Sequence, residues 1–151
     1  MPSSGRKPLP PLLFLVALLL ELALHFLLPV AHLVPPPWNL LGLTLIVGGL
    51  AITVIADQQF TRARTPVNPF ASPSTLVTHG AFRFSRNPMY LGMVAALAGV
   101  GVILGTLTPL SVPLVYAAII QQQFIRAEEV TLLQRFGPRY ATYAERVRRW
   151  L

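Results

Sequence analysis

The stretch LLFLVALLLELALHFLLPVAHLV, residues 12–34, decides the fold class of this chain. It contains no lysine, arginine or aspartate, and Glu21 is its one acidic residue. An α-helix needs about 20 apolar residues to cross the hydrocarbon core of a bilayer. Arg6 and Lys7 precede the run as in a signal peptide, but the run is too long and lacks a small-residue cleavage site. We therefore predict a retained membrane span, which Pro29 kinks or ends early because proline removes a helical hydrogen bond.

Three further apolar runs follow the first, at residues 38–56, 89–107 and 109–125. Hydrophobic residues make up 54% of the chain and charged residues 11%, where soluble domains carry about 25% charged residues. A water-soluble globule of this size would need more charged residues on its surface. We predict an all-α fold, a polytopic membrane bundle of four transmembrane helices in a single domain over residues 1–151. The absence of cysteine excludes disulfides and thiolate metal sites.

The basic residues indicate the orientation of the bundle. The formal net charge is +7, and the positive side chains lie in the N-terminus, in the long connection 57–88 and in the tail 126–151. The short turns at Pro35–Pro37 and Thr106–Pro109 carry no charge. By the positive-inside rule, we predict a multi-pass protein of the plasma or inner membrane with both termini cytoplasmic. Because the arginines flank apolar runs, membrane lipids are the expected partners, rather than nucleic acid.

The tail contains a second helix signal. Gly137-Pro138 is typical of a helix end followed by a new helix start. Beyond it, bulky side chains recur at helical spacing on one face and arginines on another. The bulky residues are Tyr140, Tyr143, Val147 and Trp150, and the arginines are Arg139, Arg146 and Arg149. The pattern predicts a short interfacial helix in the headgroup plane, with a solvated basic tail as the alternative.

Polar residues in the first run have two interpretations. Glu21, His25 and His32 are spaced to share one helical face, and carboxylate and imidazole are metal ligands. They form either a metal or proton site, or a Glu–His pair that stabilises a buried charge against the neighbouring helices. We favour the pair, because a metal takes three or four ligands and no second cluster offers them.

Two more clusters carry candidate chemistry. Pro88 can start a helix after Arg86, and a helix N-terminus beside an arginine makes a seat for an anionic group. The alternative is that the arginines only fix the orientation of the chain in the membrane, as the positive-inside rule describes. Farther on, Glu128 and Glu129 point about 100° apart on a helix, so one is expected to pair with Arg83 or Arg86. The other is then available for a cationic or hydroxyl-bearing ligand, unless both form surface salt bridges.

Glycines form a separate pattern in the second and third runs. Gly48-Gly49 and the pair Gly101 and Gly105 place small residues where helices approach closely. We favour helix packing over a close approach of a ligand to Gly99.

Three motifs resemble a known family. STLVTHGAFRFSRNPMYLG (74–92), Glu128-Glu129 and FGPRY (136–140) resemble the isoprenylcysteine carboxyl methyltransferase family, which is related to the phospholipid N-methyltransferases. The resemblance runs from Ser74 to the C-terminus. It implies a membrane enzyme that uses S-adenosylmethionine at the cytoplasmic face, with an acceptor that enters sideways from the bilayer.

The resemblance also implies site residues. The implied cofactor-binding residues are Ser74, Thr75, Leu76, Val77, Phe82, Arg86, Asn87, Pro88, Met89, Tyr90 and Glu128. Glu129 and Arg126 are the catalytic candidates, with Glu129 or His79 as the base for an amine acceptor, and no metal is expected. Asn87 stands where the family usually has histidine, and Phe82 where it usually has tyrosine.

The predicted function is therefore methyl transfer from S-adenosylmethionine to a lipophilic acceptor, either an isoprenoid carboxylate, a thiol or a lipid. One alternative is a non-catalytic membrane helper protein. Another is a small transporter or metal-handling protein that uses Glu21, His25 and His32.

Overall fold

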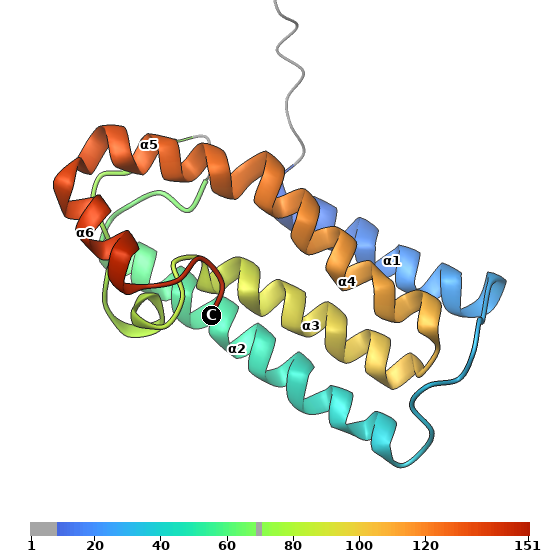
Figure 1. Cartoon of the computed structure of the whole chain (residues 1–151). Helices are drawn as coiled ribbons and strands as arrows, with labels where there is room; N and C mark the ends of the chain where they lie inside the picture. Colours follow the sequence, from blue (N-terminus) through green and yellow to red (C-terminus); the bar gives the residue numbers. More distant parts are fainter. Residues whose placement is uncertain (1–8, 69–70) are drawn as a thin grey trace, which may run out of the picture.

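The computed structural model describes residues 9–68 and 71–151, and every regular element in these ranges is helical (Figure 1). Arg6 and Lys7, which contribute to the predicted orientation, lie outside the described residues. The helices are α1 (Pro10–Leu27), α2 (Gly42–Arg62), α3 (Pro88–Leu104), α4 (Leu107–Ile120), α5 (Arg126–Phe136) and α6 (Pro138–Arg146). Short 3-10 turns lie at Trp38–Leu41 and Gly80–Arg83, and a π-helical segment at Gln121–Ile125. The all-α prediction is confirmed.

The first helix is shorter than the apolar run that predicted it. α1 ends at Leu27, two residues before Pro29, rather than continuing to Val34. The chain then crosses the turn between α3 and α4, where the amides of Leu33 and Val34 both donate to the carbonyl of Gly105. Pro29 therefore ends the helix, and the residues after it cover the end of the bundle.

Among the residues that the structure describes, two helical segments are long and apolar enough to cross a membrane, Pro10–Leu27 and Trp38–Arg62. α3 is equally apolar but shorter, and it ends where Gly105 adopts a left-handed φ of 72°. Large apolar side chains on α1 and α2 face outward, as a bilayer solvent requires. The chain thus has the helices of a membrane protein.

The helix formed by the fourth apolar run continues past residue 125. The π-helical segment joins α4 to α5 without a break, so one helical rod runs from Leu107 to Phe136 (Figure 1). Glu128 and Glu129 therefore lie inside this rod, not at a helix end. The helix stop at Gly137 and the new start at Pro138 are confirmed.

Glycines bring α2 and α3 into backbone contact. A Cβ atom added at Gly49 would meet the carbonyl of Gly92, and one at Gly92 would meet the carbonyl of Gly49. Gly42 and Gly99 face each other in the same way. Packing is thus confirmed for Gly49, whereas its neighbour Gly48 has open space around it.

The apolar core lies between α1, α3 and α4. Its buried members are Ala17, Tyr90, Leu97, Val112, Tyr116, Ile120, Phe124 and Ile125. A smaller cluster of Ala56, Val77 and Phe82 lies near the end of α2 and fixes the loop that precedes α3. These two clusters hold the start of α3 and the loop before it beside the α4–α5 rod.

Candidate functional site

A cavity of about 310 Å³ lies where the loop before α3 meets the α4–α5 rod. Its volume is in the range of small-molecule sites. Its wall is completed by the start of α1, residues 65–68, and two tyrosines of α6, Tyr140 and Tyr143. Parts of the chain from the start of α1 to α6 therefore surround one space.

Most of the predicted site residues line this cavity. They are Thr75, Leu76, Val77, Phe82, Arg86, Asn87, Pro88, Met89, Tyr90, Glu128 and Glu129. Ser74 is not in the wall, because its hydroxyl donates to the carbonyl of Arg64 at 2.8 Å and its amide to Thr65. Arg126 is exposed on the first turn of α5, also away from the cavity.

Glu128 faces the first turn of α3. The Tyr90 hydroxyl donates to Glu128 Oε1 at 2.5 Å, and the other carboxylate oxygen has no partner among the described residues. Burial raises the pKa of Glu128; the Tyr90 hydrogen bond lowers it, and the charge of Glu129 raises it again. Glu128 is thus a partly satisfied acid on the cavity wall.

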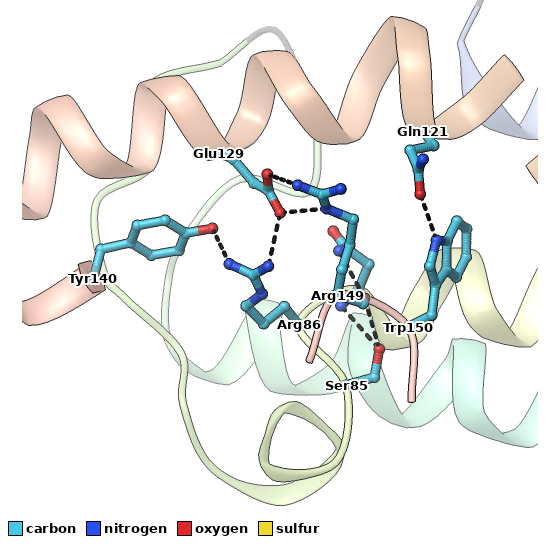
Figure 2. A network of polar contacts seen from close by, with 8 residues as sticks. Ser85, Arg86, Gln121, Glu129, Tyr140, Arg149 and Trp150 are labelled. Carbon is cyan, nitrogen blue, oxygen red and sulfur yellow. Dashed lines mark hydrogen bonds and ion pairs between the residues drawn. The ribbon is translucent and has the colours of Figure 1, made fainter. Parts of the chain in front are cut away.

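Glu129 lies in a different environment, although it is the next residue. Arg149 contacts both of its oxygens, with Nε to Oε1 at 2.8 Å and Nη2 to Oε2 at 2.6 Å (Figure 2). Arg86 Nη2 lies 3.2 Å from Oε1. The predicted pairing of one acid with Arg83 or Arg86 is therefore found between Glu129 and Arg86, while Arg83 is exposed.

Arg86 has donors left over after this pairing. Its Nη1 donates to the Tyr140 hydroxyl at 3.3 Å, and its buried Nε has no partner among the described residues. Two guanidinium groups share the single carboxylate of Glu129, so this side of the cavity carries one excess positive charge.

The C-terminal residues hold the loop before α3 in place. The Arg86 amide donates to the Arg148 carbonyl at 2.9 Å. The Arg149 carbonyl accepts from the Asn87 side-chain amide at 3.1 Å and from the Ser85 hydroxyl at 3.3 Å (Figure 2). Asn87 therefore uses its amide hydrogens to bind the tail, a role that explains an asparagine at this position.

The tail differs from its prediction in one respect. α6 ends at Arg146, so Val147 to Trp150 do not continue the predicted helical face. The segment turns back instead, and Trp150 Nε1 donates to Gln121 Oε1 in the π-helical segment at 2.8 Å. Arg149 was missed as a site residue because its position depends on this return. The Tyr143 hydroxyl, whose pKa is raised by burial, donates to the Phe82 carbonyl at 2.7 Å.

The three polar residues of the first apolar run do not share one helical face. Glu21 is fully buried without a partner for either oxygen in the described ranges, and His25 Nδ1 lies 3.2 Å from Thr106 Oγ1. His32 lies beyond the end of α1, so its predicted place on the same helical face is wrong. Among residues 9–68 and 71–151, no three potential metal ligands come together.

Comparison with known families covers most of this site. The family model described as phospholipid methyltransferase matches residues 38–139, which is more than half of the chain. No curated protein and no solved structure matches the chain. The matched range includes the loop before α3 and both glutamates, and it stops before Tyr140 and Arg149. The chain therefore belongs to the phospholipid methyltransferase family.

Proposed function

We propose that this protein transfers a methyl group from S-adenosylmethionine to a lipid acceptor at the membrane. Family membership supports the reaction class. The observation that carries the proposal is the cavity, which brings the loop residues 75–77 and 86–90 together with Glu128. These segments are more than 35 residues apart in sequence, and the proposed reaction requires that they meet at one ligand.

The charges of the cavity fit the cofactor. S-adenosylmethionine carries a carboxylate, an ammonium group and an aromatic base, together with the sulfonium that supplies the methyl group. The excess positive charge of Arg86 and Arg149 over Glu129, and the free Nε of Arg86, suit the carboxylate. The unpartnered oxygen of Glu128 suits the ammonium or the ribose hydroxyls.

The protein's part in methyl transfer is to position both reactants and to exclude water. Phe82 is buried and packs edge-to-face on Phe60, with ring centroids 4.9 Å apart, so it offers a fixed aromatic wall to the base. Leu9, Pro10 and Leu132 give the same cavity an apolar side where a lipid tail fits. We propose a positioning role for Glu129, because guanidinium groups occupy both of its oxygens.

We further propose that α1, α2, α3 and α4 are the four transmembrane helices of a single domain. The termini and the cavity then face the cytoplasm, which agrees with the arginines of the long connection and the tail. α6 lies in the headgroup layer in this arrangement. The alternative of a small transporter or metal-handling protein loses its support, because Glu21, His25 and His32 form no group of metal ligands among the described residues.

Replacement of Glu128 tests the proposal. Glu128→Gln keeps the shape of the side chain and its bond to Tyr90 but removes the charge, so we expect about tenfold weaker S-adenosylmethionine binding, as for a lost charged hydrogen bond. Calorimetric titration of the detergent-solubilised protein measures the affinity. Glu145→Gln, on the exposed surface of α6, is the matched control and should change nothing. Equal affinity of the wild type and Glu128→Gln would mean that Glu128 does not contact the cofactor. If the wild type does not bind S-adenosylmethionine at all, the alternative of a non-catalytic helper protein would replace the proposal.

The pH dependence of binding gives a second test of the same group. The pKa of Glu128 lies above its ordinary value of 4.5, and the ionised form is the one that pairs with an ammonium group. Affinity in the wild type should therefore rise with pH as Glu128 ionises, while the affinity of Glu128→Gln should not follow. The stability of the ligand-free protein should change with pH in the opposite direction. Because the pKa of Glu128 is raised in the folded state, its protonated form contributes stability that is complete below pH 4.5 and is lost as the pH rises through the raised pKa.

A further inference from the structure

A second hollow, of about 690 Å³, adjoins the cavity and shares Leu76 and Tyr143 with it. Three arginines line this hollow: Arg83, Arg139 and Arg146. It is separate from the residues proposed to hold the cofactor's charged groups. Nothing in the proposed methyl transfer uses it.

The three arginines come from two elements and converge. Arg139 and Arg146 are seven residues apart on α6, which places them on one face, and Arg83 ends the 3-10 turn opposite. All three are exposed, and none has a hydrogen bond or ion pair to another described residue. The hollow also contains the hydroxyls of Thr78 and Thr142.

Compensating acids are missing from the described lining of this hollow. Glu145 is adjacent to Arg146 in sequence, but it points about 100° away around α6 and does not line the hollow. Arg86 and Arg149 differ from these three arginines, because both of them form ion pairs with Glu129. Three uncompensated positive charges around a concave surface concentrate positive potential there.

This combination has the chemistry of a phosphate site. Guanidinium groups bind phosphate oxygens in pairs of parallel hydrogen bonds, and threonine hydroxyls supply further donors. The residue beside Arg83 is Phe84, whose side chain is 75% exposed. Phenylalanine beside arginines is found in segments that lie in the headgroup layer of a membrane. We propose that this hollow binds the phosphate of an anionic phospholipid from the surrounding bilayer.

Lipid titrations test the site directly. Short-chain phosphatidylglycerol, short-chain phosphatidylcholine and inorganic phosphate are titrated separately into the detergent-solubilised full chain. We expect saturable phosphatidylglycerol binding, weakened about tenfold or more in the double variant Arg139→Gln with Arg146→Gln, because charged hydrogen bonds are lost. Arg83→Gln should weaken binding in the same direction.

A matched control separates this site from general attraction between charges. Arg62→Gln with Arg135→Gln removes the same charge from two exposed arginines elsewhere, so it should leave the affinity unchanged. Equal losses in both double variants would overturn the site. Equal binding of phosphatidylcholine would overturn the preference for an anionic headgroup, and arginine-dependent binding of inorganic phosphate alone would overturn the lipid as its source. S-adenosylmethionine affinity should stay constant in the Arg139–Arg146 variant, so the two proposals fail independently.

Discussion

The α2–α3 interface and the polar network beside the cavity are held together in opposite ways. Along α2 and α3, glycines let backbone atoms touch, and the contact depends on the absence of side chains. At the cavity, Arg86, Glu129 and Arg149 make contact through the ends of long charged side chains. The first region therefore tolerates no added volume, whereas the second tolerates no lost charge.

The two regions also differ in how far they reach along the chain. The helices of the glycine interface are consecutive, but Asn87 and Arg149, which share a hydrogen bond, are 62 positions apart. A defect between α2 and α3 should thus prevent folding of the bundle. A defect in the network should leave the bundle folded and change what the cavity binds.

The largest effect is expected from Gly49→Ala. The new methyl group would meet the backbone carbonyl of Gly92 and the amide of Ala96, and backbone atoms cannot move aside by changing rotamer. Overpacking of this kind costs about 1–3 kcal/mol, so the thermal unfolding midpoint in detergent should fall clearly.

Gly48→Ala is the control on the adjacent residue. A Cβ at Gly48 has nothing within 4 Å, so the change should leave stability unchanged or raise it by up to about 1 kcal/mol through helix propensity. Equal unfolding midpoints for the two variants would mean that α2 and α3 are not in backbone contact.

A smaller effect on stability, with a larger one on binding, is expected from Arg149→Ala. Its side chain is 34% exposed, so losing the ion pair should cost no more than about 1 kcal/mol. Arg86 would then bind Glu129 alone and the excess positive charge would disappear, so S-adenosylmethionine affinity should fall about tenfold. Arg149→Lys keeps the positive charge but cannot bind both carboxylate oxygens as a guanidinium does. Its S-adenosylmethionine affinity should therefore lie between those of the wild type and Arg149→Ala.

Arg148→Ala provides the comparison for that experiment. Arg148 is exposed, and only its backbone carbonyl takes part in the network, so both affinity and stability should match the wild type. A lower unfolding midpoint together with unchanged affinity in Arg149→Ala would show that the network serves folding and not the cavity.

The same contrast explains what the sequence predicted. Apolar runs and Gly137-Pro138 signal local structure, so the helical fold and the start of α6 were predictable. Glu129 and Arg86 were also recognisable, because paired acids and a proline-initiated helix have a local pattern. The return of Arg149 to the loop was not predictable, because it depends on where α6 ends and on the continuous α4–α5 rod. The predicted position of His32 on the first helix was wrong for a similar reason, because the helix ends before Pro29.

The smallest expected effect concerns Trp150, which lies between the apolar core and the polar network. Its ring packs against the apolar core, and its indole nitrogen donates to Gln121. Trp150→Phe keeps most of the packing and loses one hydrogen bond, so it should cost about 1 kcal/mol in thermal unfolding. If the lost hydrogen bond is the cause, Trp150→Phe combined with Gln121→Met should lose clearly less stability than the sum of the two single losses, because each change removes the same contact. Full additivity would place Trp150 with the core alone, and the polar network would then end at Arg149.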